Sequence, residues 1–140
     1  MRSINKIINR VNRNGLKFGN WEYYHSDGVL ESKGSYKNDL RDGIWEYYYR
    51  DGSLKCKGLF KNVNADGIWE YYYDNGLLNS RGLYNNGERD GYWEYYKDGK
   101  LWYKGLYKNG EMDGIWEDYN SRGEITSRTL YKEGEFIKSI

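Results

Sequence analysis

The sequence of 140 residues contains no proline and only one cysteine, Cys56. Without proline, every residue of a central β-strand can donate its backbone N–H to a neighbouring strand. A single cysteine excludes a disulfide bond within the chain. Polar secreted domains of this size often depend on disulfides, so we expect a reducing compartment and assign the protein to the cytoplasm.

Long apolar segments are also missing, and the formal net charge is only +1. No stretch approaches the roughly 18 apolar residues of a membrane span, and the basic residues 1–17 lack the apolar run of a signal peptide. The 22 Lys and Arg residues are balanced by 21 Asp and Glu residues. Because no overall field would attract a polyanion, we expect no nucleic-acid partner.

Aromatic residues are plentiful instead, with 17 Tyr and 6 Trp in the chain. These side chains bury large areas while keeping a polar group near water. The composition therefore predicts a thin structure in which most residues lie close to solvent, rather than a globule with a thick dry interior.

Tryptophan recurs at a regular interval along the chain. Trp21, Trp45, Trp69 and Trp93 are spaced by 24 residues, and Trp116 follows after 23. Each lies in a Gly-x-Trp-Glu-Tyr-Tyr motif or a close variant of it, and a turn that ends in Gly follows each motif. A fixed period of this length indicates a repeat protein. The predicted repeats span residues 18–41, 42–65, 66–89, 90–112 and 113–136.

Each repeat is expected to form a β-hairpin. Aromatic and β-branched runs bounded by Asp-Gly or Asn-Gly are the strongest local signal for two antiparallel strands joined by a tight turn. Because the links between repeats are short as well, successive strands should pair in chain order. The sequence therefore predicts an all-β fold, an antiparallel meander of about ten strands over residues 15–140 that forms one elongated, single-layer sheet.

Alternation along the strands assigns side chains to the two faces of the sheet. The Trp and the first Tyr of each motif share one face with a recurring Gly of the second strand, which leaves room for an indole ring. The Glu of each motif shares the other face with one basic residue per repeat, so cross-strand ion pairs are expected there. These charged residues are Glu22, Glu46, Glu70, Glu94 and Glu117 with Lys33, Lys57, Arg81, Lys104 and Arg128. The apolar residues expected beside them are Ile44, Ile68, Ile115, Leu59, Leu83, Leu106 and Leu130.

The segment 107–119 reads Tyr-Lys-Asn-Gly-Glu-Met-Asp-Gly-Ile-Trp-Glu-Asp-Tyr, with Asp118 at the place of the first Tyr. It closely resembles the MORN repeat, and most of all the bacterial variant found in antitoxin-like proteins. The resemblance covers about residues 15–138 and implies an elongated, twisted single-layer sheet with a grooved aromatic face. It also implies a protein-interaction or membrane-apposed scaffold. Choline-binding cell-wall modules repeat similar residues, but the 24-residue period and the Glu after Trp favour the MORN variant.

Residues 1–14 form a separate basic segment ahead of the repeats. Ile4, Ile7, Ile8 and Val11 fall on one stripe of a helix, so we predict a short amphipathic helix here. In the preferred interpretation this helix folds over the first sheet edge and blocks pairing with another chain. A helix that lies on an anionic membrane and a disordered segment are the alternatives.

Signatures of catalysis and metal binding are absent from the sequence. The same Glu recurs in every repeat, whereas an active site needs carboxylates in different environments. His25 and Cys56 lie in different repeats and do not by themselves make a nucleophile–base pair. We therefore predict a protein that is not an enzyme, with no catalytic residue, no metal site and no cofactor.

The rows of aromatic side chains are the remaining candidate site. Exposed Tyr and Trp side chains are typical of protein interfaces, so we predict a scaffold that binds a protein partner along the aromatic face, as an antitoxin-type neutraliser would. Carbohydrate or cell-envelope binding by ring stacking and membrane contact through the N-terminal helix are the less favoured alternatives. The sheet edges could also pair two copies into a homodimer. The predicted partner-binding residues are Trp45, Tyr47, Trp69, Tyr71, Trp93 and Tyr95.

Overall fold

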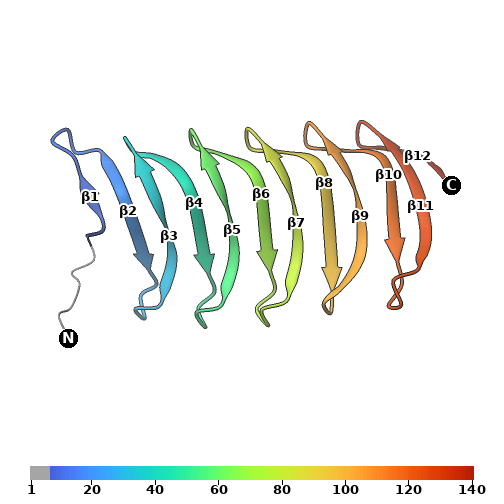
Figure 1. The fold of residues 1–140 in the computed structure, drawn as a ribbon, viewed down its shortest axis with the longest axis horizontal. Helices are drawn as coiled ribbons and strands as arrows, with labels where there is room; N and C mark the ends of the chain where they lie inside the picture. Colours follow the sequence, from blue (N-terminus) through green and yellow to red (C-terminus); the bar gives the residue numbers. More distant parts are fainter. Residues whose placement is uncertain (1–6) are drawn as a thin grey trace.

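The computed structural model describes residues 7–140. These residues form one open antiparallel sheet of 12 strands, which follow one another across the sheet in chain order (Figure 1). The predicted all-β meander is confirmed, and a short strand is added at each end of the predicted array. The strands are β1 (Arg10–Val11), β2 (Lys17–Tyr24), β3 (Leu30–Lys37), β4 (Leu40–Tyr48), β5 (Leu54–Lys61), β6 (Asn64–Tyr72), β7 (Leu78–Asn85), β8 (Glu88–Lys97), β9 (Lys100–Lys108), β10 (Glu111–Tyr119), β11 (Ile125–Lys132) and β12 (Glu135–Ser139).

The links between repeats are two-residue turns in which both residues have a positive φ. Asn86 (φ 49°) and Gly87 (φ 88°) join β7 to β8, and Asn109 (φ 50°) and Gly110 (φ 82°) join β9 to β10. This is type I′ geometry, whose twist matches that of the flanking strands and which the sequence Asn-Gly favours. Tight links keep successive strands adjacent and leave both faces of the sheet uncovered by connecting chain.

The Asp-Gly pair before Trp45, Trp69, Trp93 and Trp116 belongs to a strand and not to a turn. β8 begins at Glu88 and continues through Gly91 (φ 114°), where its pairing with β7 shifts register. This bulge takes the Leu83 carbonyl out of the β-ladder, and Trp93 Nε1–H donates to that oxygen at 2.9 Å. The same bond recurs from Trp45 to Ser35 (3.0 Å), from Trp69 to Leu59 (3.1 Å) and from Trp116 to Leu106 (3.1 Å).

The core of the protein is a row of tryptophans on one face of the sheet. Trp93 is fully buried and packs against Gly82 of the preceding strand. A Cβ added at Gly82 would lie 2.2 Å from Cδ2 of the indole, so only glycine fits there. Tyr84 meets the indole edge-on at 5.2 Å and Tyr95 flanks it at 6.1 Å, so one layer of side chains suffices to bury the ring. The predicted glycine–indole packing is confirmed, and it recurs as Gly34–Trp45, Gly58–Trp69 and Gly105–Trp116.

A strand, not a helix, begins the described part of the chain. Within residues 7–14 the predicted helix is wrong, because β1 lies there and pairs with β2, whereas residues 1–6 lie outside the described part. The Asn9 side chain also binds the edge of β2, since it donates to the Glu22 carbonyl (3.1 Å) and accepts from the Glu22 N–H (2.8 Å). A helix of this length is marginal in water, and hydrogen bonds to an open strand edge compete with it successfully.

The first repeat differs from the others because no glycine-bearing strand precedes it. Trp21 is only partly buried, and its Nε1 finds no hydrogen-bond partner among residues 7–140. Lys17 Nζ lies 4.8 Å from the ring centroid, just as Arg41 and Arg89 of later repeats lie over Trp45 and Trp93. Tyr23 and Tyr36 flank Trp21, whereas four rings surround Trp45, so the first tryptophan is packed less completely.

Candidate functional site

Side chains alternate between the two faces of the sheet as predicted. In β4, Trp45 and Tyr47 lie on the face that holds the tryptophan row, which we call the aromatic face. Glu46 lies on the opposite face, which we call the ladder face after its ion pairs. Because the fold is a single layer, each face is available as a binding surface.

The six residues that the sequence predicted to bind a partner all lie on the aromatic face. Trp45, Trp69 and Trp93 are 1%, 4% and 0% exposed, so their indoles belong to the core. The tyrosines of the set are half-buried, so their rings, unlike the indoles, are open to a partner. These tyrosines are Tyr47, Tyr71 and Tyr95. Their role in partner binding stays a prediction.

The tyrosine hydroxyls of the aromatic face are already hydrogen-bonded. Tyr71 Oη lies 3.1 Å from Tyr84 Oη, and Arg89 Nη1 donates to Tyr95 Oη at 3.1 Å. Burial raises the pKa of Tyr71 and Tyr95, so these hydroxyls stay protonated at neutral pH. The Arg89 guanidinium also lies 4.6 Å from the centroid of the Trp93 ring. The polar groups of this face are therefore largely satisfied within the protein.

The ladder face carries the predicted ion pairs. Arg81 Nε lies 2.7 Å from Glu94 Oε2, and Tyr96 Oη donates to the same carboxylate at 2.9 Å. Both charged partners are partly exposed, so each pair contributes about 0.5 kcal/mol. The other pairs are Lys33–Glu46 (3.0 Å), Lys57–Glu70 (3.6 Å), Lys104–Glu117 (3.8 Å) and Arg128–Glu117 (3.0 Å).

Acid is expected to weaken the sheet through these glutamates. The hydrogen bond from Tyr48, and then the Lys33 ammonium, hold the pKa of Glu46 below its usual value against the opposing effect of burial, and the pKa of Glu117 is lowered too. A depressed carboxyl stabilises the fold above its unfolded pKa of about 4.3, and this contribution disappears as the pH falls through the folded pKa. Urea unfolding should therefore give a lower free energy at pH 3 than at pH 7.

The variant with Glu46→Gln and Glu117→Gln is the control for this pH effect. It should lose about 0.5 kcal/mol per site at pH 7, because the ion pairs are gone. Its stability should then fall less than that of the wild type on acidification. An equal fall in both proteins would show that other carboxylates control the acid sensitivity.

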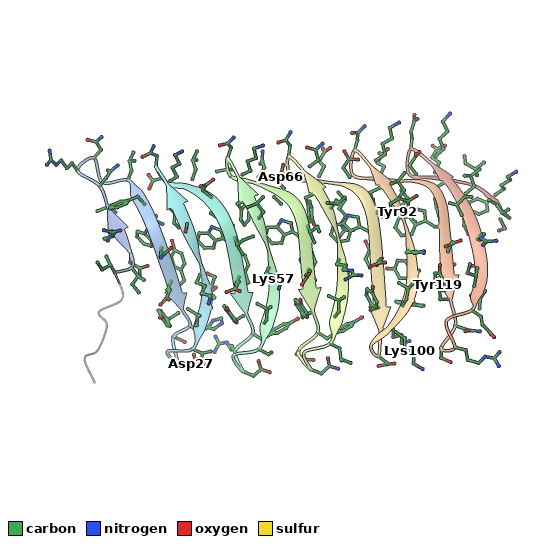
Figure 2. The ribbon with its side chains drawn as sticks, in the orientation of Figure 1. Asp27, Lys57, Asp66, Tyr92, Lys100 and Tyr119 are labelled. Carbon is green, nitrogen blue, oxygen red and sulfur yellow. The ribbon has the colours of Figure 1, made fainter. Side chains whose placement is uncertain are left out.

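A row of exposed apolar side chains crosses the ladder face beside the ion pairs. It is supplied by the residue between Gly and Trp of each motif, from the second repeat to the fifth. We call it the apolar row: Ile44 (59% exposed), Ile68 (62%), Tyr92 (69%) and Ile115 (49%). The leucines paired with these residues are Leu59, Leu83, Leu106 and Leu130. Figure 2 labels Tyr92 of the row and Lys57 of the ladder, and Lys57 lies farther from the turns that link the repeats.

The apolar row is the surface that sequence reasoning missed as a site. The sequence pattern predicted that Ile44, Ile68 and Ile115 lie on this face, but they were not among the predicted partner-binding residues. The available signal was an apolar residue at the second motif position in four of the five repeats, where a solvated face would favour polar side chains.

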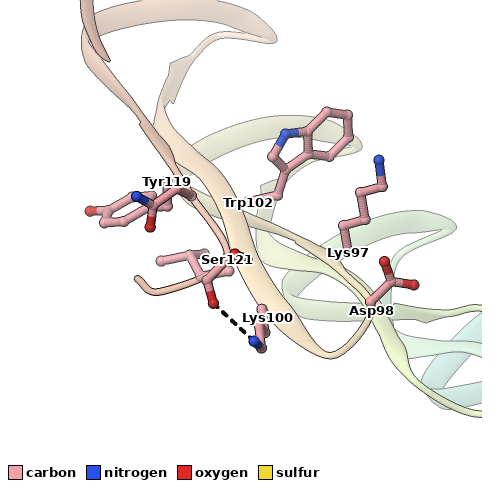
Figure 3. A pocket seen from close by; sticks show the side chains of 8 residues that line it. Lys97, Asp98, Lys100, Trp102, Tyr119 and Ser121 are labelled. Atoms are coloured by element: carbon pink, nitrogen blue, oxygen red, sulfur yellow. Dashed lines mark hydrogen bonds between the residues drawn. The ribbon is translucent and has the colours of Figure 1, made fainter. Parts of the chain in front are cut away.

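Trp102 departs from the repeat pattern. The equivalent residues of the other repeats are Glu31, Lys55, Asn79 and Thr126. Its ring is 47% exposed, and Lys97 Nζ lies 5.4 Å from the ring centroid. It borders a hollow of about 390 Å³ that Tyr119 also lines, next to the bond from Lys100 Nζ to the Ser121 carbonyl (Figure 3). An exposed ring among polar groups is suited to stacking against a flat ligand.

The isolated reactive side chains are not combined into a catalytic site in the part of the chain that the structure describes. His25 lies between β2 and β3, and its Nε2 is buried without a hydrogen-bond partner there. Cys56 lies opposite Tyr47, and burial raises the pKa of its thiol, which disfavours the reactive thiolate. No helix of residues 7–140 could span a membrane. The same residues contain no cluster of three or more His, Cys, Asp or Glu side chains that could hold a metal ion.

Comparison with known protein families bears on these repeats directly. The family model described as MORN repeat variant matches residues 19–38, 41–62, 65–86 and 89–109. Together the four matches cover more than half of the chain. A search of curated proteins finds no match.

Proposed function

The chain belongs to the family of MORN repeat variant proteins, and from this premise we propose that it is a non-enzymatic scaffold that binds a protein partner. MORN repeats commonly act as protein- or membrane-binding repeats, and an all-β repeat sheet is typical of a binding module. The resemblance to antitoxin-like variants supports a partner that is neutralised by binding. The single cysteine supports a cytoplasmic setting.

The apolar row is the observation that carries this proposal. Its four side chains are 49–69% exposed, and leucines of the intervening strands join them into a strip across the sheet. Soluble proteins that expose an extended apolar strip generally use it for binding. The adjacent ion pairs supply the polar rim that is typical of protein interfaces. The half-buried tyrosines of the aromatic face are the second candidate surface.

Serine substitution of the three isoleucines of the apolar row tests the proposal. Because Ile44, Ile68 and Ile115 are exposed, replacing each by Ser should change the free energy of unfolding by about 0.5 kcal/mol or less. The wild type and the triple variant are immobilised, and proteins captured from the host lysate are quantified by mass spectrometry. We expect the partner of the wild type to be reduced about tenfold or more on the variant.

A matched triple variant of the aromatic face separates the two surfaces. Replacing Tyr47, Tyr71 and Tyr95 by Ser removes the rings that this face leaves open to a partner, and circular dichroism checks that the variant is folded. A partner that is lost only from this variant would move the site to the aromatic face. Full capture by both folded variants, or no specific capture by the wild type, would contradict the proposal.

Carbohydrate binding is the second candidate function, and Trp102 is the observation that favours it. The exposed indole lies beside Lys97 and borders a hollow that both apolar and polar side chains line, an arrangement that suits a sugar ring. Glycan-array binding that Trp102→Ala abolishes would support this function in place of the first. An array without hits would remove it.

A further inference from the structure

Four aspartates form a second row beside the apolar row. Each precedes an apolar-row residue by two positions, and the pairing of Asp66 with Leu59 places it on the ladder face. We call these residues the acid row: Asp42, Asp66, Asp90 and Asp113. Figure 2 shows Asp66 near the turns that link the repeats, on the side of Tyr92 that is remote from Lys57.

The acid row is not neutralised within the described part of the chain. None of its members forms an ion pair with another residue of 7–140, although Asp90 accepts a hydrogen bond from Asn85 Nδ2 and Asp113 accepts one from the Glu133 N–H. The turns that link the repeats beyond the row (residues 37–41, 61–65, 85–89 and 108–112) add three lysines, two arginines, two glutamates and one aspartate. With the four aspartates of the row, this margin of the sheet carries five basic and seven acidic residues and is net acidic.

Both rows repeat at the same interval along the sheet. Equivalent residues lie two strands apart, and strands are spaced by about 4.7–4.9 Å, so the interval is about 9.4–9.8 Å. Four repeats therefore give rows about 29 Å long. A partner that follows them must present apolar and basic groups along a matching line.

The ladder face offers a partner mainly side chains. Every strand from β2 to β11 is paired on both sides. The hydroxyls of Tyr48 and Tyr96 are also occupied, because they donate to Glu46 and Glu94. An extended peptide would bury its own unpaired backbone groups on the apolar strip, which is costly. An α-helix avoids this cost because its backbone is hydrogen-bonded internally.

The dimensions of a helix fit the two rows. Seven residues of an α-helix rise about 10.5 Å, which is close to the interval of the sheet. An apolar stripe with this period can therefore place one side chain against each member of the apolar row. The mismatch accumulates to about 2–3 Å over three intervals, a distance within the reach of flexible Lys and Arg side chains.

We propose that the partner presents a basic amphipathic helix that lies across the strands of the ladder face. Its apolar stripe packs on the apolar row, and its Lys or Arg side chains pair with the acid row. This inference rests on the proposed function and names the class of segment that is bound. The first repeat has Phe18 and Asn20 at the equivalent positions, so the site begins at Asp42 and Ile44 in the second repeat.

Three synthetic peptides of 24 residues test the proposal, with the full chain as the receptor. The first carries a heptad stripe of Leu flanked by Lys, the second has Glu in place of every Lys, and the third is a scrambled form of the first. Fluorescence anisotropy gives Kd, and circular dichroism follows helix formation. We expect the first peptide to bind and gain helix, and the other two to bind about tenfold more weakly or less.

A matched pair of protein variants locates the contact. Asp66→Asn with Asp90→Asn should raise the Kd of the basic peptide about fivefold and weaken its dependence on salt. Asp74→Asn with Asp98→Asn makes the same charge change in the turns within the repeats, at the opposite margin of the sheet. This variant should leave Kd unchanged. The Ile→Ser triple variant should also lose the peptide.

Three outcomes would overturn the helix proposal. These are equal binding of the basic and acidic peptides, equal Kd for the two Asn variants, and no binding of any peptide. If the helix proposal fails while the Ile→Ser variant still loses a captured partner, the proposed function stands and only the class of segment is wrong. Loss of both results would remove the proposed function as well.

Discussion

Replacing Trp93 by alanine is expected to lower the free energy of unfolding by about 4–5 kcal/mol. The indole is fully buried, so its removal leaves a cavity between Tyr84 and Tyr95 that a single-layer sheet has no other side chains to fill. The variant also loses the bond from Nε1 to the Leu83 carbonyl, which the bulge has taken out of the ladder. An unpaired buried carbonyl adds to the cost of the cavity.

Urea unfolding monitored by circular dichroism measures this loss of stability. Two further variants separate the loss of the hydrogen bond from the loss of the ring and provide an exposed control. Trp93→Phe keeps a ring but loses the donor, so it should cost about 1–3 kcal/mol. Trp102→Ala removes an exposed indole and should change stability by about 0.5 kcal/mol or less. Similar losses for Trp93→Ala and Trp102→Ala would mean that the tryptophan row is not the core.

Replacing Gly58 by alanine is expected to destabilise the protein by about 3 kcal/mol. Alanine in a strand normally gains about 0.5–1 kcal/mol over glycine. At this position the added Cβ would lie 2.1 Å from Cδ2 of Trp69, so the ring must move away from the sheet. That movement would stretch the bond from Trp69 to the Leu59 carbonyl and open the contact with Phe60.

Thr129 provides a natural control for the glycine effect. It pairs with Trp116 as Gly58 pairs with Trp45, but β12 follows it and brings no tryptophan. Thr129→Ala should therefore change stability by about 0.5 kcal/mol or less. If the clash causes the loss, Gly58→Ala combined with Trp69→Leu should cost less than the sum of the two changes. Strict additivity would contradict this explanation.

The repeat, the face assignment and the indole–glycine contact could all be predicted from the sequence. The reason is that each depends on local chemistry that is repeated along the chain. Tight turns favour Asn-Gly or Asp-Gly, and alternation assigns each side chain to a face. Gly58 and its equivalents recur at one fixed position of the second strand, in register with the packed aromatic residues. A misleading local signal in one repeat is outweighed by the consistent signals of the other repeats.

The bulges and the first strand could not be predicted, because pairing across the sheet decides them. Asp90-Gly91 has the composition of a turn, yet the chain has already turned at Asn86-Gly87. Residues 7–11 have a helical apolar pattern, yet the open edge of β2 provides hydrogen bonds that a short helix cannot match. In both places the local signal is genuine and a non-local contact outweighs it.

The candidate site shows the same division. Alternation correctly assigned Trp45, Trp69 and Trp93 to one face, but it cannot tell how far neighbouring rings cover them. The edge-on contacts of Tyr36 and Phe60 with Trp45 follow only from the assembled sheet. The apolar row shows the opposite case, since a sequence pattern that resembles a core position lies exposed because no second layer covers it.

Trp45, Trp69, Trp93 and Trp116 each pack on a glycine of the strand before them, so each of these four contacts joins one repeat to the preceding repeat. The array is therefore a linear series of repeats in which the glycine–tryptophan contacts hold each repeat to its neighbour. A duplicated unit of 24 residues would bring one glycine and one tryptophan, and would create one new joint while leaving the others unchanged. Gene duplication could therefore lengthen the molecule in steps of about 9.6 Å and set the span of its surface by copy number alone.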